Sequence, residues 1–340
     1  MSQTRIAVYG PERRIGVWHE DLLVDLGHAD ERLPADLPGL IELGERGLDL
    51  ADSAVKAALK SGAPGDGTVF DIATVTLHPP AVHRPRIACA GGNYAAHTLG
   101  SAKRKGFEAT NALAGLVDSG GMPTANEVVA KTRERGEPRG FWKDSATLMG
   151  SDNDIFYPDR CERLDYEGEV AVVLGREALD VPPGRGHDFV WGVTLINDWS
   201  IRKKSGKSTS SFNLSKNWYG SASIGPCIVV GDIDPGDLEV ETRVNGELRQ
   251  QYNSGDMIFS HAEYIEYLSR DFALLPGDMI SGGSGPGTAT DAEKDLATGD
   301  EISDERRESL FLQAGDIVEV SSVEIGTLRN CIVAKGRVAR

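Results

Sequence analysis

Short apolar segments of strand length, separated by turn-forming residues, dominate the chain, and few segments have the spacing of a helix. Near the N-terminus the strand-like segments are 5–9, 15–18 and 21–25. A helix is expected from Leu37 to Ser61, because the Gly- and Pro-containing segment 62–67 that follows would end it. These elements predict a small N-terminal α+β subdomain over residues 1–75.

From about residue 86 the pattern changes to apolar runs rich in β-branched residues. The predicted strands are 87–90, 169–174, 189–197, 227–230, 238–244, 279–281 and 316–324. The clearest helical pattern is 260–269, where Ala262, Ile265 and Leu268 fall roughly on one face. Many strands with one clear helix favour a mixed α+β roll over a doubly wound sheet. We therefore predict a second domain over residues 82–340.

Two polar segments interrupt this second domain, at about 101–140 and 285–309. The first contains Gly and partly helical sequence, and the second is acidic and begins with Gly and Pro. Loops of this length inside a compact domain are usually lids, functional loops or disordered segments. We interpret both segments as insertions.

Charge and cysteine content limit the class of protein. The chain has 340 residues with 52 acidic and 36 basic side chains, for a formal net charge of −16. Such a surface would repel nucleic acid and anionic membranes, so neither is expected as a partner. No apolar run approaches the roughly 20 residues that span a bilayer, and the first residues lack a secretory pattern. The four cysteines are widely spaced and indicate neither a zinc site nor a redox motif. A cytoplasmic location is therefore expected.

A pair of acidic residues precedes an apolar strand. Side chains alternate between the faces of a strand, so Glu167 and Glu169 should point to one side with Cα atoms roughly 7 Å apart. Two such carboxylates repel one another unless a cation lies between them. Asp198 ends another apolar strand and is the third candidate ligand. Oxygen ligands favour Mg²⁺, Mn²⁺ or Ca²⁺. The solvated face of a sheet also produces this spacing, so the pair alone does not establish a metal site.

Seven short motifs occur together over about residues 85–335. They are Asp-Tyr-Glu-Gly-Glu at 165–169, Ile-Asn-Asp-Trp-Ser-Ile-Arg at 196–202, Ile-Gly-Pro at 224–226, Val-Asn-Gly-Glu-Leu-Arg-Gln at 244–250, Asn-Ser-Gly-Asp-Met-Ile at 253–258, Leu-Pro-Gly-Asp at 275–278 and Ile-Gly-Thr-Leu-Arg-Asn at 325–330. In this order they resemble the fumarylacetoacetate hydrolase family. The resemblance implies a β-roll catalytic domain, a homodimer, and Mg²⁺ or Mn²⁺ held by Glu167, Glu169 and Asp198.

The resemblance also assigns roles to single positions. Lys216 matches the family's active-site lysine, which would hold a substrate oxygen and offset enolate charge. His97, in the segment 91–97, matches the histidine that activates water, a role suited to an imidazole that titrates near neutrality. Ser284 or Ser281 would replace the threonine of the family's Gly-rich turn. The residues expected to bind substrate are Lys143, Arg202, Gln250 and Ser284.

The sequence departs from the family beside the histidine. Many relatives have a glutamate three residues after it, which orients the imidazole, and Gly100 stands at that position here. Glu108 in the first insertion and Glu293 in the second are the candidates to replace it, and Glu293 is taken as the third catalytic residue. The long 101–140 segment predicts an unusual lid and an unusual substrate.

Together these features predict a divalent-metal-dependent hydrolase. Its substrate would be a small oxo-acid or diketone, namely a 1,3-dicarbonyl or acylpyruvate-like compound, whose C–C bond breaks toward a metal-bound enolate. Gly100 keeps an alternative open, a hydratase, dehydratase or decarboxylase of a 2-oxo acid that uses the same metal site without hydrolysis. A non-catalytic metal- or ligand-binding protein is the third alternative.

Overall fold

The computed structural model describes residues 3–61, 67–105, 123–204 and 212–334. Within these ranges the chain is a mixed α+β protein with large sheets and few helices, as the strand-rich pattern predicts. None of the described helices is both long and apolar enough to cross a bilayer.

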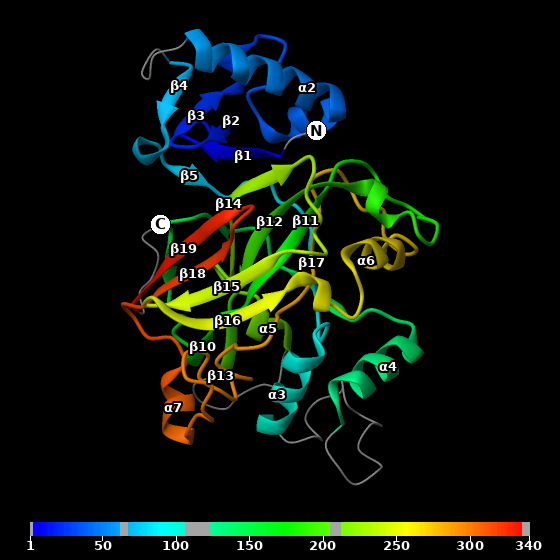
Figure 1. Cartoon of the computed structure of the whole chain (residues 1–340), viewed down its shortest axis with the longest axis vertical. Helices are drawn as coiled ribbons and strands as arrows, with labels where there is room; N and C mark the ends of the chain where they lie inside the picture. The colour runs from blue at the N-terminus through cyan, green and yellow to red at the C-terminus, as the bar shows by residue number, and fades with distance from the viewer. Residues whose placement is uncertain (1–2, 62–66, 106–122, 205–211, 335–340) are drawn as a thin grey trace.

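The N-terminal residues form a sheet covered by one long helix. Its elements are β1 (Thr4–Tyr9), β2 (Arg14–His19), β3 (Leu22–Asp25), α1 (Leu26–Ala29), α2 (Leu37–Ser61), β4 (Val69–Asp71) and β5 (Leu77–His78). Non-helical backbone at Gly44 kinks α2. β1 pairs antiparallel with β14 (Ala222–Val230), with Ile6 opposite Ile228. The N-terminal sheet therefore continues into the sheet of the rest of the chain, as Figure 1 shows.

The large sheet has twelve strands among the described residues, in the order β4-β3-β2-β1-β14-β12-β11-β17-β6-β7, with β5 and β8 paired off this path. Its remaining strands are β6 (Ile87–Ala90), β7 (Gly140–Lys143), β8 (Leu148–Met149), β11 (Gly168–Leu174), β12 (Val190–Asp198) and β17 (Met279–Ser281). Every residue of β11 is buried, because the strand lies inside the sheet and both of its faces are covered.

Two smaller sheets complete the β structure. One is β16-β15-β18-β19-β9, and the other is β10-β13. Their strands are β9 (Asp154–Phe156), β10 (Cys161–Asp165), β13 (Ser200–Lys204), β15 (Glu239–Val244), β16 (Glu247–Asn253), β18 (Ile317–Ser322) and β19 (Gly326–Val333). A separate apolar core containing Tyr166, Trp199 and Leu312 lies beside the short sheet.

Helices are more numerous than the hydrophobic pattern predicts. They are α3 (Ala95–Lys105), α4 (Ala125–Arg135), α5 (Phe212–Lys216), α6 (His261–Leu268) and α7 (Asp304–Ser309). Of these, α6 matches the predicted 260–269 helix, and Ser260 begins it with a capping box to Glu263. The others are short or polar, so they bury too few apolar residues to leave a clear helical period. In α4, for example, Val128 is the buried residue.

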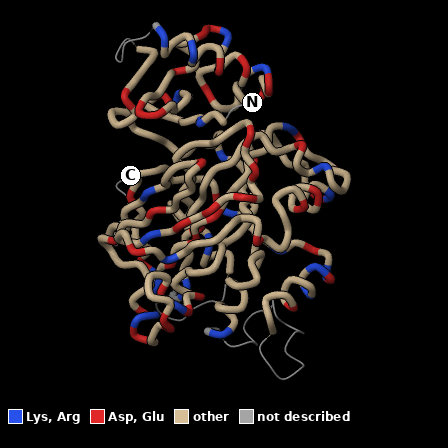
Figure 2. Tube along the Cα trace, viewed as in Figure 1, with Lys and Arg blue, Asp and Glu red and all other residues tan. Residues whose placement is uncertain are grey.

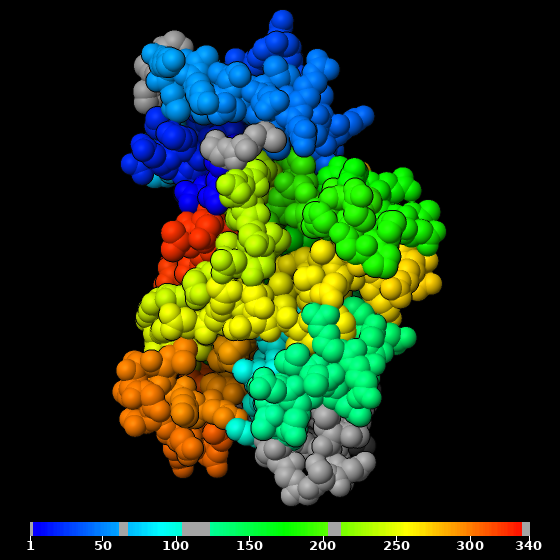
Figure 3. Space-filling view, turned by 45° about the vertical axis from the view of Figure 1, so that its right-hand side comes forward, coloured from blue at the N-terminus to red at the C-terminus, as the bar shows by residue number. Residues whose placement is uncertain are grey.

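Figure 3 shows α3, α4 and α7 at one end of the molecule. The cyan segment around α3 lies between the orange segment that contains α7 and the green-cyan α4. Acidic and basic residues are interspersed along the surface elements, as Figure 2 shows, and α7 contains both signs within residues 304–307. In this view α4 and α7, which come from the two polar segments of the sequence, lie on opposite sides of α3.

Candidate metal centre

Three carboxylates lie close together where β11 begins and β12 ends. The two strands pair antiparallel with Gly168 opposite Asn197, and the Asp198 N–H donates to the Glu167 carbonyl at 2.9 Å. This register brings Asp198 next to Glu167 and Glu169, whose side chains lie on one face as their spacing predicts. The exposed fractions are 2%, 1% and 1% for Glu167, Glu169 and Asp198, and their oxygens lie within 4.8 Å of one another.

Buried cations surround two of these carboxylates. Lys216 Nζ donates to Asp198 Oδ2 at 2.6 Å and also pairs with Glu167. Lys143 pairs with Asp198, and Arg202 pairs with Glu167. Burial opposes ionisation of Glu167, but the charges of Arg202 and Lys216 outweigh it and hold the pKa of Glu167 well below its usual range. For Lys216, burial is likewise outweighed by Asp198 and Glu167, which raise the pKa of its ammonium group.

Glu169 differs from its neighbours, because hydroxyl groups rather than an ion pair contact it. Ser284 Oγ donates to it at 2.6 Å, and Ser281 donates to its other oxygen. Burial, followed by the charges of Asp198 and Glu167, raises the pKa of Glu169 to about 8. A cation among the three carboxylates would favour the ionised form and so oppose both burial and the repulsion between the carboxylates. The donor set therefore fits a hard divalent cation with oxygen ligands.

His97 has a carboxylate partner, but a different one from those predicted. Its Nδ1 lies 3.0 Å from Asp291 Oδ2. Asp291 is itself held, since Thr288 Oγ1 donates to its Oδ1 at 2.6 Å and the Gly287 N–H donates to its Oδ2 at 3.3 Å. The charge of His97 lowers the pKa of Glu167 after the larger effects of burial, Arg202 and Lys216, so the imidazole lies within electrostatic range of the cluster.

The expected partner Glu293 is occupied elsewhere. Its carboxylate pairs with Lys103 at 2.6 Å on the exposed side of α3. Glu108, the other candidate, lies outside the described residues. The correction is therefore that Asp291, two residues before Glu293, is the carboxylate in contact with His97.

Gly100 explains why the partner comes from a loop. A Cβ atom at this position would lie 2.6 Å from the carbonyl oxygen of Asp291 and 2.9 Å from its Cβ. Only glycine lets the 288–291 turn approach α3 this closely, and that approach brings Asp291 to His97. A sequence signal existed in Thr288 and Asp291, whose three-residue spacing is typical of a hydroxyl–carboxylate turn.

The positions predicted to bind substrate are near the cluster and contact protein groups. Lys143 Nζ donates to the carbonyl of Lys216 at 2.5 Å in addition to pairing with Asp198. Gln250 is fully buried; it accepts from the Gly168 N–H and donates to the Gly285 carbonyl, both at 3.0 Å. Gln250 thus joins the carboxylate strand to the Gly-rich turn.

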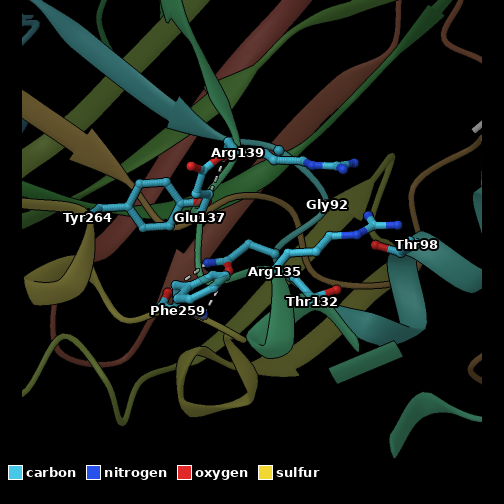
Figure 4. A pocket seen from close by; sticks show the side chains of 10 residues that line it. Gly92, Thr98, Thr132, Arg135, Glu137, Arg139, Phe259 and Tyr264 are labelled. Carbon is cyan, nitrogen blue, oxygen red and sulfur yellow. Dashed lines mark hydrogen bonds between the residues drawn. The ribbon is translucent and has the colours of Figure 1, made fainter. Parts of the chain in front are cut away.

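Two cavities border the helix that contains His97. The one in Figure 4, of about 20 Å³, is lined by residues before and on α3, on and after α4, and near α6, including Gly92, Thr98, Thr132, Arg135 and Tyr264. The other, of about 240 Å³, is an open cleft lined by residues that include Gly100, Lys103, Asp291 and Arg307. The second cleft is lined by Asp291, the residue whose buried carboxylate contacts His97.

Comparison with known proteins identifies the family. Residues 86–333 match the model of the fumarylacetoacetate (FAA) hydrolase C-terminal domain. The chain belongs to the fumarylacetoacetate hydrolase family. This family includes enzymes named as hydrolases, isomerases and a tautomerase, and its solved members have the same mixed α+β fold.

The relatives differ in how much of this chain and of their own length the alignment covers. Oxaloacetate tautomerase fahd2 of Xenopus laevis mitochondria is 28% identical over 331 residues, covering 95% of this chain and 87% of the relative. A Staphylococcus saprophyticus protein is 36% identical over 198 residues, which are 57% of this chain and 61% of that protein's own length. The chain thus matches less than two thirds of that relative.

Solved structures of the family superpose over nearly the whole chain. Fumarylacetoacetate hydrolase from Exiguobacterium antarcticum is 26% identical with a TM-score of 0.66, covering 98% of this chain and all of that one. Maleylpyruvate hydrolase from Sphingobium sp. SYK-6, solved with manganese(II) and pyruvate, has a TM-score of 0.66 at 21% identity and shares the fold.

Proposed function

We propose that this chain is a divalent-metal-dependent hydrolase that cleaves a C–C bond in a 1,3-dicarbonyl or acylpyruvate-like small molecule. The observation that supports it is the His97–Asp291 pair beside a buried carboxylate cluster. Hydrolysis needs a base that activates water. Because Gly100 replaces the glutamate that orients the histidine in many relatives, a carboxylate partner for His97 was in doubt, and Asp291 is such a partner. The fumarylacetoacetate hydrolase of Exiguobacterium antarcticum, a relative with the same fold, is consistent with this reaction class.

The three carboxylates would hold the cation. Glu167, Glu169 and Asp198 provide oxygen ligands, with Mg²⁺ or Mn²⁺ as the proposed ion and Ca²⁺ as the third candidate. When bound, the cation would act as a Lewis acid on a substrate carbonyl.

The side chains of this protein supply the proton transfers and the charge. Asp291 accepts from Nδ1 of His97, which leaves Nε2 to remove a proton from the attacking water. The water oxygen bonds to the carbonyl carbon, and the bond between that carbon and its neighbour breaks. The electron pair stays on the departing carbon as an enolate, which is protonated to the second product. Lys216, which is buried and pairs with Asp198, would stabilise the negative charge of the enolate oxygen.

A second candidate is keto–enol isomerisation of a 2-oxo acid. The Xenopus laevis relative, aligned over 95% of this chain, is named an oxaloacetate tautomerase. That reaction moves a proton between carbon and oxygen and needs no attacking water. In that reaction His97 would transfer the carbon-bound proton, and Lys216 and the carboxylate cluster would stabilise the enolate charge.

Product analysis in isotopically labelled water distinguishes the two. The purified protein with Mn²⁺ or Mg²⁺ would be incubated with acylpyruvates in H₂¹⁸O. Hydrolysis yields two fragments, one of them with ¹⁸O in a new carboxylate, whereas isomerisation yields one product of unchanged composition. A hydratase would give one product heavier by water. Enol–keto interconversion with no fragment from any acylpyruvate would overturn the hydrolase proposal.

Assembly and location belong to the same proposal. A homodimer is proposed from family membership, and a sedimentation mass near 36.5 kDa at micromolar concentration would refute it. A cytoplasmic location is consistent with the cysteines at 89, 161, 227 and 331, which are free thiols in the structure.

A further inference from the structure

Asp165 is a buried carboxylate that takes no part in the proposed reaction. It is the last residue of β10 and is fully buried. Its Oδ2 accepts from Arg202 Nε at 2.8 Å, its Oδ1 accepts from the Ala289 N–H at 2.8 Å, and the Thr290 N–H approaches Oδ2 at 3.2 Å. One side chain therefore contacts two segments that lie more than eighty residues apart in the chain.

The first contact orients a charge at the metal centre. Arg202 presents Nε to Asp165 and Nη2 to Glu167, so the two carboxylates fix the plane of the guanidinium group from both sides. Asp165 does not touch the proposed cation site itself. Its effect on Glu167 passes through Arg202, which contacts both carboxylates.

The second contact orients the turn that presents the carboxylate to His97. Asp165 accepts from the backbone of Ala289 and Thr290, and Asp291 is the next residue. The position of this backbone determines where the Asp291 carboxylate lies relative to His97 Nδ1. The turn has further support from Thr288, but that bond lies within the turn and does not attach it to the strands.

We propose that Asp165 is a positioning residue that couples the geometry of the metal centre to that of the His97–Asp291 pair. It acts through Arg202 on one side and through the backbone at 289–290 on the other. The inference rests on the proposed function for the catalytic use of His97, while its contacts and its two measurable effects do not depend on which reaction the enzyme performs.

The test compares Asp165→Asn with two reference variants. Asp291→Asn changes the His97 contact and the bonds from Thr288 and Gly287 within the turn, and leaves the contacts of Arg202 unchanged. Asp25→Asn is a matched structural control, because Asp25 is also fully buried and also accepts from an arginine fork, Arg14, and from a backbone N–H, at 2.6–2.7 Å, in the N-terminal sheet.

Two measurements without turnover give the outcome. Calorimetric titration with Mn²⁺ measures metal affinity, and ¹⁵N NMR of the His97 ring measures how much of the imidazole has its proton on Nδ1. For Asp165→Asn we expect Mn²⁺ affinity to fall about 10- to 100-fold, as for other groups that orient metal ligands, and the Nδ1–H form to decrease. Asp291→Asn should alter only the tautomer, and Asp25→Asn should alter neither while lowering the melting temperature.

The inference is overturned if Asp165→Asn behaves as Asp25→Asn does, with wild-type affinity and tautomer, or if only one of the two measurements changes. Should Asp165→Asn fail to fold, Asp165→Glu retains the charge and displaces the carboxylate by one methylene, and both measurements should still shift. If the wild type cleaves no acylpyruvate but both measurements respond to Asp165→Asn, the proposed function fails and the positioning role stands.

Discussion

The carboxylate cluster and the His97–Asp291 pair lie in one site but are assembled differently. The cluster comes from two adjacent strands, whose register places Glu167, Glu169 and Asp198 together. The pair joins a helix to a turn 194 residues further along the chain. The first arrangement follows from strand geometry, whereas the second depends on how closely a loop can approach a helix, and Gly100 sets that approach.

This difference has an energetic counterpart. The cluster places three carboxyl groups in a buried space, and burial together with the charges of Asp198 and Glu167 raises the pKa of Glu169. The pair has opposite charges when the imidazole is protonated, together with hydrogen bonds that hold Asp291 from two sides. Removing one carboxylate should therefore reduce repulsion in the cluster, whereas removing one partner of the His97–Asp291 pair should leave the other side chain less well fixed.

The largest expected effect is on turnover, from breaking the pair. His97→Ala should lower kcat by about 10²–10⁴, the usual contribution of general acid–base catalysis. Asp291→Asn should lower kcat by a smaller factor, because the imidazole remains but its tautomer is no longer fixed. Steady-state kinetics on a cleavable diketone measure both, and Mn²⁺ affinity should stay as in wild type.

Glu293→Gln is the control for that comparison. Its carboxylate pairs with Lys103 and does not touch His97, so kcat should change less than twofold on the scale of an exposed ion pair. If Glu293→Gln had a strongly reduced kcat while Asp291→Asn kept the wild-type value, the His97–Asp291 pairing would not be the functional one. The turn would then have to rearrange when substrate binds.

The next effect concerns the cluster. Glu169→Gln should abolish the stabilisation by Mg²⁺ or Mn²⁺, which for wild type is about 2.7 kcal/mol at a metal concentration 100 times Kd. Thermal melts with and without metal give this quantity. Glu319→Gln, on β18 outside the cluster, is the control and should keep the full metal response. An undiminished response in Glu169→Gln would remove Glu169 from the ligand set.

Gly100→Ala tests the close approach that makes the pair. The added methyl group would meet the Asp291 carbonyl oxygen at 2.6 Å, so the turn must move, at a cost of about 1–3 kcal/mol typical of overpacking. Stability to urea should fall, and kcat should fall with it although no polar group is removed. Gly236→Ala serves as control, since its methyl group would meet only the side-chain oxygen of Asp234 at 3.3 Å. A wild-type kcat in Gly100→Ala would refute the steric account.

The smallest effect is a pH dependence of the metal-free protein. The pKa of Glu169 is raised by burial and by its acidic neighbours from 4.5 to about 8. Between these values the folded state keeps a proton that the unfolded state has lost, so stability decreases as the pH rises, by at most about 1.4 kcal/mol per pH unit.

Comparison with Glu169→Gln isolates this contribution. His261, whose pKa burial lowers to about 4, titrates in both proteins and cancels in the difference. Urea unfolding in the presence of a chelator, at intervals from pH 5 to 8, should show wild type losing stability relative to the variant. Parallel pH profiles would mean that the repulsion within the cluster is compensated in the metal-free protein.

The strand-based part of the site could be predicted from sequence because its determinants are local. Alternation along β11 places Glu167 and Glu169 on one face, and the apolar run that ends at Asp198 marks the neighbouring strand. The same local signals predicted most strands and α6. Family resemblance then added Lys216 and His97, which the structure brings to or near the cluster.

The loop-based part could not be predicted for a physical reason. Whether Asp291 or Glu293 faces His97 depends on the path of the backbone after the Gly-rich turn, and a shift of two residues changes the answer. The role of Asp165 was hidden in the same way, since its partners Ala289 and Thr290 offer only backbone N–H groups. No side-chain pattern records such a contact. Helices α3 and α4 were not predicted because they are polar and show no clear apolar period.

The pairing of β1 with β14 has a consequence for how this protein can be divided. The family match begins at residue 86, which suggests a convenient place to start a shorter chain. Without β1, however, the N–H and C=O groups of β14 at 228–230 would lose their partners and become an open sheet edge. Such edges recruit other strands and promote aggregation, and this one is flanked by apolar side chains such as Ile228 and Val230. We therefore expect a chain that starts at residue 86 to aggregate more readily than the full chain, because the start of the family match lies inside one continuous sheet.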